Sequence, residues 1–355
     1  MREMQFGTRV IGDKHPCCIV LEAGPTHYGL ESALALVDAA AESGADAIKF
    51  QIGDAKRLIP DPNVMFTYTY LVNKATGETA VCTESLQKIL LRRQLSKDEW
   101  RTVAAQCKKR GITFFATAFN VEDFELFHDI GVDCVKICSG DITYHHILRE
   151  AAKYPWVVQI DTGSSTIGEV AEAVEVLEQA GTSKIIINHC PSGYPANLNS
   201  IHLRVITSLR TLFPYPIAFS DHNPGSTMDI VAVALGCNML EKTITLDRTI
   251  RSPEHIMSLE PQEICTFIQT IRDVETALGN PRRLKTPEER KAFPVGRRSL
   301  IARMDIPEGT ILTQEHLDYA RPGDGLPPSL DTLLIGQRTV CAKVRGERFS
   351  LSDIV

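Results

Sequence analysis

The sequence lacks the long apolar run that a membrane-spanning helix requires. No apolar stretch in its 355 residues approaches the roughly 20 residues that cross a bilayer. An excess of basic residues is also missing, since the net charge is −6 and the pI is about 6.0. We therefore expect no membrane partner and no nucleic-acid partner, although local cations can still bind a small anion. Residues 1–15 show no apolar core and no cleavage site of a signal peptide, so we expect a cytoplasmic protein.

Cysteine motifs for zinc binding or for a disulfide framework are missing too. Ten cysteines are scattered along the chain, and no two of them form a C-x-x-C pair. Most lie within apolar runs, which is typical of reduced, buried thiols in the cytoplasm. We therefore expect neither a structural zinc site nor disulfide bonds.

What the sequence does contain is a regular alternation of short apolar runs and helix-like patterns. The runs are nearly continuous, as in parallel strands buried on both faces, and they cover residues 17–24, 46–51, 113–119, 134–140, 156–163, 184–190, 216–222 and 238–245. Helical patterns intervene at about 29–43, 97–110, 121–130, 144–153, 166–180, 199–212, 226–235 and 261–279. Eight such units predict an α/β fold, a (β/α)8 TIM barrel. A doubly wound open sheet is the alternative, but no G-x-G-x-x-G follows the first run.

Two segments depart from this alternation. Segment 52–96 is too long for a simple connection, and long insertions at this end of a barrel are typical of functional lids or subunit contacts. Residues 280–296 are polar and contain prolines, as in a linker, and short β-like pieces with turns follow. We therefore expect a barrel domain over residues 1–279, a linker over 280–296 and a small β-rich domain over 297–355.

Polar residues gather where the predicted strands end, which is the face of a barrel that carries chemistry. They are Glu22, Lys49, Thr117, Lys136, Ser139, Asp161, Thr162, His189, Ser220, Asp221, His222, Glu241 and Lys242. Two strand-borne lysines with hydroxyl side chains suit an anion that carries a carboxylate and a phosphate. Glu22 and His222 suit acid–base chemistry or a divalent ion. Taken singly, a buried Lys–Glu pair or a strand-end histidine is equally well explained as a structural contact.

Several stretches, in order and at matching spacings, resemble the sialic acid synthase family over nearly the whole chain. They are LEAGPTHYG (21–29), GADAIKFQ (44–51), VKICSGD (135–141), DTG (161–163), HCPSGYPA (189–196), FSDHNPG (219–225), AVALGCNMLEKTITLDR (232–248) and SLEPQE (258–263). The tail, from DIPEGTIL through RPGDGLPP to IGQRTV, resembles the antifreeze-like SAF domain of that family. The resemblance implies a TIM barrel followed by a β-clip SAF domain.

The resemblance also implies a reaction. Phosphoenolpyruvate condenses with an open-chain N-acylated hexosamine, such as N-acetylmannosamine or a diacetamido-trideoxyhexose, and phosphate is released. The product is a nine-carbon 3-deoxy-2-keto sugar acid. The implied cofactor is a divalent metal, Mn²⁺ or Mg²⁺, which acts as Lewis acid and template. The implied assembly is a homodimer in which two chains exchange their small domains.

By the same resemblance, individual residues take roles. Glu22 is the acid–base glutamate, and His222 is a metal ligand at the reacting centre. The positions that bind phosphoenolpyruvate are Lys49, Lys136, Ser139 and Ser220, with Ser192 and Asp161 at two further positions of that group. Sugar-side positions are Asp141, Tyr194 and Glu254, and Arg321 is expected to reach the acyl group of the sugar in the opposite subunit.

Thr243 departs from the family pattern. The family reads E-(K/R)-H-(F/I)-T with a second metal-binding histidine, whereas this chain has threonine, a weak neutral ligand. Asp161 replaces a serine and adds negative charge where phosphate is expected. Thr26, Tyr28 and Ser192 also depart. Either the metal site is rebuilt from His222 with Glu254 or Asp161, or catalysis is retuned or lost.

Three functions therefore stay open at this point. The first is a synthase with an atypical acceptor sugar. The second is a homologue that binds a sugar or a phosphate without turnover. The third is a barrel aldolase with a Schiff base on Lys136, against which the SAF-like tail argues.

Overall fold

The structure is a computed structural model that describes residues 3–355 and divides the chain into two compact units. One unit ends at Gly279, and the other runs from Asn280 to Val355. In the first unit, eight parallel strands close into a barrel in the order β3, β4, β7, β8, β9, β10, β11, β12. The predicted (β/α)8 barrel is confirmed. The open doubly wound sheet is wrong, because β12 pairs with β3 and closes the ring.

Each predicted apolar run coincides with one barrel strand, and only β4 extends beyond its run, by one residue. The strands are β3 (Cys18–Glu22), β4 (Ala47–Ile52), β7 (Thr113–Ala118), β8 (Cys134–Ile137), β9 (Val157–Asp161), β10 (Ile185–His189), β11 (Ile217–Asp221) and β12 (Met239–Thr243). The helices that surround them are α1 (Leu30–Glu42), α4 (Lys97–Arg110), α5 (Asp123–Ile130), α6 (His145–Ala151), α7 (Ile167–Gln179), α8 (Leu198–Ile201), α9 (Val205–Leu212), α10 (Thr227–Ala234) and α11 (Pro261–Leu278). The pattern at 199–212 forms two helices, because His202 adopts a left-handed φ of 47° between them.

The barrel interior is apolar at the end where the strands begin. A hairpin of β1 (Met4–Phe6) and β2 (Arg9–Ile11) packs there against inward-facing strand residues such as Val20 and Ile186. The ring of Phe6 meets that of Phe115 edge-on, with 5.9 Å between centroids. Side chains two residues apart on a strand face the same side. Glu22, two residues beyond Val20, therefore points into the interior at the carboxyl end of the strands. The same alternation along the other strands brings their polar side chains to this end.

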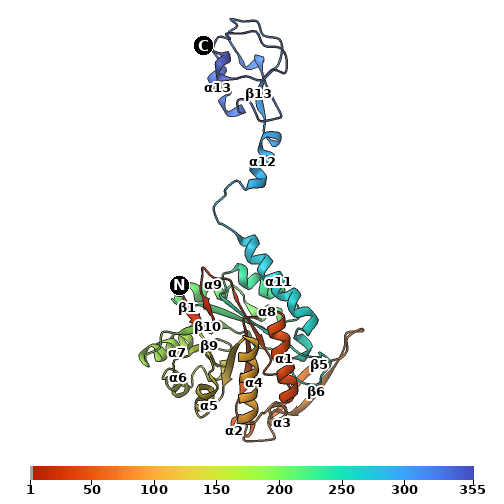
Figure 1. The fold of residues 1–355 in the computed structure, drawn as a ribbon, viewed down its shortest axis with the longest axis vertical. Coiled ribbons are helices and arrows are strands. Elements are labelled where there is room, and N and C mark those ends of the chain that lie inside the picture. Colours follow the sequence, from red (N-terminus) through yellow and green to blue (C-terminus); the bar gives the residue numbers. More distant parts are fainter. Residues whose placement is uncertain (1–2) are drawn as a thin grey trace. The chain divides into compact units, whose positions relative to one another are not determined.

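The insertion after β4 has its own structure, which the sequence did not resolve. It contains α2 (Ala55–Leu58), a hairpin of β5 (Met65–Asn73) and β6 (Glu78–Ser85), and α3 (Leu86–Leu91). Figure 1 shows this hairpin extending from the edge of the barrel. The hydroxyl of Tyr68 donates to Glu84 at 2.6 Å and lies 3.3 Å from the carbonyl oxygen of Arg251. This links the insertion to the loop that follows β12.

The second unit is small and built around a short apolar core. Its elements are α12 (Pro287–Gly296), β13 (Ser299–Ala302), η3 (Gln314–His316), β14 (Leu317–Ala320), η4 (Pro328–Leu330), α13 (Asp331–Leu334) and η5 (Leu351–Asp353). Strands β13 and β14 pair antiparallel, and isolated bridges such as Ile306 to Lys343 extend the pairing. Helix α12 lies in the segment predicted as a linker. Thr286 and Glu289 cap it reciprocally, and Pro287 occupies its first turn.

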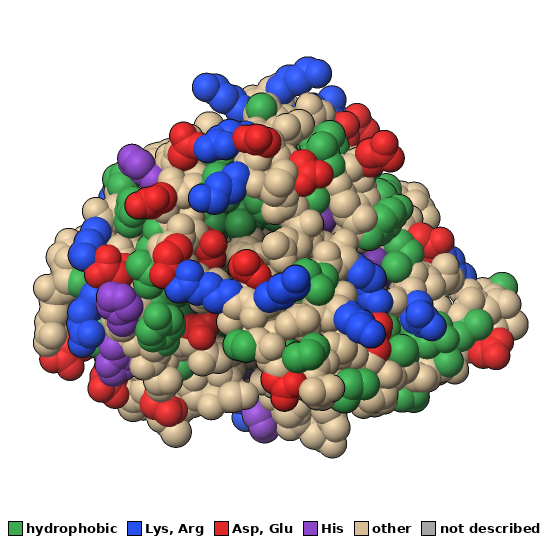
Figure 2. All heavy atoms as spheres, turned by 90° about the horizontal axis from the view of Figure 1, so that it is seen from below, with side chains coloured by type: hydrophobic (Ala, Val, Ile, Leu, Met, Phe, Trp, Pro, Cys, Tyr) green, Lys and Arg blue, Asp and Glu red, His purple; other side chains and the backbone are tan. Residues whose placement is uncertain are grey.

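Surface and thiol properties follow the sequence. The ten cysteines are free thiols. On the face shown in Figure 2, acidic and basic side chains are interspersed. Within residues 3–355, no helix is both long enough and apolar enough to span a bilayer.

Candidate active site

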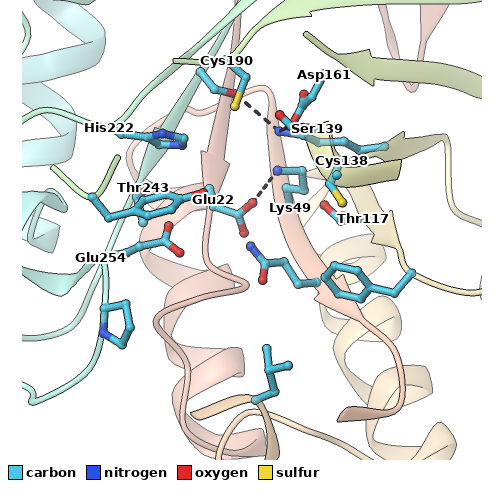
Figure 3. A pocket seen from close by; sticks show the side chains of 18 of the residues that line it. Glu22, Lys49, Thr117, Cys138, Ser139, Asp161, Cys190, His222, Thr243 and Glu254 are labelled. Carbon is cyan, nitrogen blue, oxygen red and sulfur yellow. Dashed lines mark hydrogen bonds and ion pairs between the residues drawn. The ribbon is translucent and has the colours of Figure 1, made fainter. Parts of the chain in front are cut away.

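A cavity of about 330 Å³ opens at the carboxyl ends of the barrel strands. The predicted site residues that line it are Glu22, Lys49, Lys136, Ser139, Asp161, Tyr194, Ser220, His222 and Glu254, together with Thr243. In the view of Figure 3, Asp161, Ser139 and Thr117 lie on one side, and His222, Thr243 and Glu254 on the other. Glu22 and Lys49 lie between these two groups. Residues from almost every strand thus converge on one chamber.

Two lysines and three carboxylates form a buried network at the base of this cavity. Lys49 Nζ lies 2.5 Å from Glu22 Oε2 and 3.1 Å from Glu241 Oε2. Lys136 Nζ lies 2.7 Å from Glu241 Oε2 and 2.9 Å from Asp161 Oδ2. Three carboxylates against two ammonium groups leave one negative charge in excess, so a bound polyanion must displace or neutralise a carboxylate.

Glu241 is the centre of the network. Its carboxylate also accepts hydrogen bonds from Ser220 Oγ at 2.6 Å and from Gln159 Nε2 at 2.6 Å. Burial raises the pKa of Glu241, but the charges of Lys136 and Lys49 outweigh that effect and keep the pKa below its usual range. Glu241 therefore stays ionised and holds both ammonium groups in place.

Lys136 is held in its charged form. Burial lowers its pKa, but the charges of Asp161 and Glu241 raise it well above the usual value. A Schiff-base lysine needs a neutral amine at working pH. The aldolase reading with Lys136 as nucleophile therefore conflicts with this geometry.

His222 lines the cavity, and among residues 3–355 only its Nδ1 has a hydrogen-bond partner. Its Nδ1 lies 3.0 Å from the carbonyl oxygen of Pro191, and since a carbonyl only accepts, Nδ1 carries the proton. Burial, aided by the charge of Lys136, lowers the pKa of His222 to about 4. The imidazole is therefore neutral near pH 7, with its lone pair on Nε2. The ring of Tyr194 packs against it with 4.7 Å between centroids.

Glu254 is a carboxyl group whose pKa lies near neutral pH. Burial raises its pKa to about 7; the charge of Arg93 lowers the pKa and that of Glu22 raises it. Its backbone has a left-handed φ of 75°, a conformation that costs energy for a residue with a side chain. Strain and a raised pKa at a cavity wall are both typical of functional residues. The residue precedes the short helix η2 (His255–Met257).

The donor set does not fit a metal site with two histidines. Thr243 is buried at the cavity wall, where the family resemblance places the second imidazole. Across residues 3–355, no three His, Cys, Asp or Glu side chains are grouped so that they could hold a metal ion. A threonine hydroxyl is a weak ligand for Mn²⁺ beside an imidazole.

Gly163 allows a close approach behind Ser139. A Cβ atom at this position would collide with Ser139 Oγ and lie 2.6 Å from the carbonyl oxygen of Cys190. The glycine therefore lets Ser139 sit beside Asp161 at the wall of the cavity.

Some predicted residues lie elsewhere. Ser192 Oγ lies 3.1 Å from Ser164 Oγ on the loop after β10, outside the cavity lining. Asp141, in the short helix η1 (Ser139–Asp141), accepts from Cys138 Sγ at 3.0 Å and is also outside the lining. Arg321 belongs to the second unit.

Strand parity separates neighbours that the sequence grouped together. Lys242 follows Glu241 and points away from the cavity, where its Nζ contacts Asp221 and lies 3.1 Å from Asp229 Oδ2. His189 likewise turns outward, with Nε2 2.6 Å from the carbonyl oxygen of Ile201. Lys242 and His189 therefore make structural contacts, which is the alternative that the sequence left open for a buried lysine pair and for a strand-end histidine.

The insertion supplies a wall that sequence reasoning missed. Its apolar lining residues are Leu58, Ile59, Phe66, Leu86, Ile89 and Leu90. It also contributes Arg93, and β4 contributes Gln51. The double arginine in LLRRQLS was the only visible signal for Arg93, and it does not distinguish a cavity residue from a surface one.

Comparison with known proteins identifies relatives of both parts of the chain. The model of the NeuB family matches residues 36–283, and that of the SAF domain matches residues 297–355. The N,N'-diacetyllegionaminic acid synthase of Campylobacter jejuni is 34% identical, over 87% of this chain and 91% of its own length. Human N-acetylneuraminate-9-phosphate synthase is 31% identical, over 94% of this chain and 91% of its own length.

A solved structure is similar as well. The N-acetylneuraminic acid (sialic acid) synthetase of Leptospira borgpetersenii, crystallised with citrate, has a TM-score of 0.71 and 29% identity. The match covers 82% of this chain and 94% of that one. The NeuB family model alone accounts for more than half of the chain, and the predicted SAF-type tail is confirmed. The chain therefore belongs to the NeuB family.

Proposed function

We propose that this protein condenses phosphoenolpyruvate with an N-acylated amino sugar to form a 3-deoxy-2-keto sugar acid and phosphate. The observation that carries the proposal is the pair of buried lysines, Lys49 and Lys136, which form ion pairs at the cavity that the Ser139 and Ser220 hydroxyls also line. Such a group is built to receive a small ligand with carboxylate and phosphate charges. The names of the relatives, which are sugar acid synthases, point to the same class.

Substrate binding in this proposal is an exchange of ion pairs. Both lysines already contact carboxylates, so the phosphate and carboxylate of phosphoenolpyruvate take over part of these contacts. Asp161 is the carboxylate best placed to be displaced, because it contacts Lys136 from the side of Ser139 and Gly163. Glu241 stays fixed by hydrogen bonds from Ser220 and Gln159. The exchange keeps the lysines paired throughout, which avoids leaving a buried charge alone.

The proposed chemistry proceeds in three steps. C3 of phosphoenolpyruvate attacks the aldehyde carbon of the sugar, and the aldehyde oxygen takes a proton from Glu254. Water adds to C2 and loses its proton to Glu22. Phosphate then leaves from the tetrahedral intermediate and takes the proton of the C2 hydroxyl as the ketone forms. The proton held by Glu22 returns to Glu254 through solvent and restores both carboxyl groups.

Three side chains have the protonation state or the orientation that these steps require. Glu254 is partly protonated near pH 7, so it can donate to the developing alkoxide. Glu22 is held by Lys49 at 2.5 Å and by the backbone N–H of Gly24 at 2.5 Å, which fixes its orientation. Neutral His222 can accept a hydrogen bond at Nε2 from the water or a sugar hydroxyl.

The assembly is part of the proposal. The family resemblance supports a homodimer in which Arg321 of each chain completes the site of the other. A divalent cation also stays a prediction of the resemblance, although His222 is the one histidine among the described residues that line the cavity.

A second candidate function is sugar or phosphate binding without turnover. The specific observations in its favour are the saturated lysine network and the threonine at position 243. The two candidates differ in one measurable quantity, which is sugar-dependent consumption of phosphoenolpyruvate.

The test is phosphate release by the full chain. Purified protein is incubated with phosphoenolpyruvate and a panel of N-acylated hexosamines, with and without Mn²⁺, beside the Lys136→Met variant. A synthase releases phosphate only when sugar is present, and the variant does not. Binding of a sugar in calorimetry with no phosphate release for any sugar would support the second candidate.

A further inference from the structure

Arg93 is a basic residue at the wall of the active-site cavity. It follows helix α3 and lines the active-site cavity as well as a small adjoining hollow formed with Gln51 and Phe119. Its Nε and Nη1 atoms are buried, and among residues 3–355 neither has a hydrogen-bond partner. Burial lowers the pKa of Arg93, yet a guanidinium remains charged at neutral pH.

Two other arginines of the insertion behave differently. Arg92 forms two hydrogen bonds of 2.8 Å with the Glu84 carboxylate, and Arg57 pairs with Glu122 at 2.5 Å. These are exposed pairs of the usual kind. Arg93 instead enters a wall made of Leu58, Leu90 and other apolar side chains. A buried cation without a partner is costly, so the site is incomplete without an anion.

The surroundings of Arg93 indicate which substrate would bring that anion. The carboxyl group with the strongest effect on Arg93 is that of Glu254, followed by Glu22, but no carboxylate of residues 3–355 forms an ion pair with it within 4 Å. The proposed function assigns Glu254 to the sugar side of the cavity. Lys49 and Lys136, which are proposed to bind phosphoenolpyruvate, lie on β4 and β8. Arg93 comes from the insertion, a separate element.

We propose that Arg93 binds an anionic group carried by the acceptor sugar, a carboxylate or a phosphate ester remote from the aldehyde carbon. This inference rests on the proposed function, since it names the class of its acceptor. The two free N–H groups of the guanidinium fork match two oxygens of such a group. The surrounding apolar wall excludes water and strengthens the contact. The site thereby selects an anionic amino sugar over a neutral one.

The experiment compares three acceptors in the full chain. They are N-acetylmannosamine, its 6-phosphate and the corresponding uronic acid, which separate the two sources of charge. The measured quantity is the ratio of kcat/KM for each charged sugar to that for the neutral sugar. We expect a ratio of about ten or more in the natural protein for at least one charged sugar, and its loss in Arg93→Met. Arg92→Met is the matched control, because that arginine is exposed and paired with Glu84.

Calorimetric binding of the charged sugars, without phosphoenolpyruvate, separates this proposal from the proposed function. Binding that disappears in Arg93→Met without any phosphate release would support the anion site and contradict the synthase. An equal loss for neutral and charged sugars, or a change confined to the KM of phosphoenolpyruvate, would overturn the role assigned to Arg93. An unchanged ratio in a folded Arg93→Met variant, checked by its thermal midpoint, would overturn it as well.

Discussion

Asp161 Oδ2 lies 2.9 Å from Lys136 Nζ, so a carboxylate of the protein already holds an ammonium group that is proposed to bind phosphoenolpyruvate. This pair competes with substrate. Removing the carboxylate in Asp161→Ser should lower the KM for phosphoenolpyruvate about tenfold, because one opposing charge disappears while Glu241 still pairs with Lys136. Steady-state kinetics at fixed sugar concentration measure the change. Asp141→Asn, outside the cavity, is the control, and an unchanged or higher KM in Asp161→Ser would refute the exchange of ion pairs.

Glu254 makes the rate depend on pH. If its protonated form donates to the sugar, kcat/KM should fall as pH rises above about 7, the pKa of this group. Glu254→Gln should reduce kcat by about 10²-fold or more and remove that alkaline limb. A variant that keeps both the rate and the limb would exclude Glu254 as the acid.

The same carboxyl group links pH to stability. Folding raises the pKa of Glu254 above that of an ordinary glutamate, so between about pH 4.5 and 7 the folded state binds more protons than the unfolded state. Its contribution to the free energy of unfolding is therefore lost as pH rises through that window. Thermal midpoints at both ends of the window should converge in Glu254→Gln relative to the natural protein; a larger spread in the variant would contradict the assignment.

Thr243 accounts for the missing second imidazole. Thr243→His would place a second imidazole on β12, beside the free Nε2 of His222, and should tighten Mn²⁺ binding by about tenfold or more. Electron paramagnetic resonance of free Mn²⁺ measures the affinity without reference to activity. Thr243→Val provides the size-matched comparison. Equal Mn²⁺ affinity in all three proteins would show that position 243 is not a ligand position.

Lys242 is a structural residue beside a functional one. Replacing it by methionine leaves the carboxylates of Asp221 and Asp229 without their buried cation, which should cost about 3–5 kcal/mol of the free energy of unfolding. Urea unfolding, followed by circular dichroism, measures this cost. Lys184→Met removes an exposed lysine and should change stability by less than about 0.5 kcal/mol. Comparable stabilities for the two variants would be inconsistent with the buried cluster.

Arg321 tests the exchange of small domains between subunits. Arg321→Ala and Lys136→Met should each be nearly inactive. A mixed dimer would contain one intact site, which combines the barrel of the Arg321→Ala chain with the small domain of the Lys136→Met chain. Reassembly of equal amounts should restore roughly a quarter of the natural activity if partners mix statistically. Inactive mixtures, with mixed dimers shown by mass spectrometry, would argue that Arg321 serves its own chain or no site.

The sequence predicted the barrel well because its strands are buried on both faces. Runs such as 184–190 are continuous in apolar residues, and the structure places β10 within that run. Helix α12 was missed, although Thr286 and Glu289 have the spacing of a capping box. The polar composition of 280–296 outweighed that local signal.

The site was only partly predictable, for two physical reasons. Strand parity decides which polar residues face the cavity, and a shift of one residue at the end of β12 separates Glu241 from Lys242. The insertion has neither a strand period nor a long helical one, so nothing in the pattern placed Arg93 at the cavity wall. Thr243, by contrast, was recognised because the residues around it match a known pattern.

Carbon labelling tests the proposed condensation more directly than phosphate release, because it follows the new carbon–carbon bond. The full chain is incubated with phosphoenolpyruvate labelled with carbon-13 at C3 and with each N-acylated hexosamine, and products are identified by mass spectrometry. We expect a labelled sugar acid that contains three more carbons than the acceptor and forms in step with phosphate release. Unlabelled sugars with intact phosphoenolpyruvate, from a folded protein that binds both compounds, would contradict it.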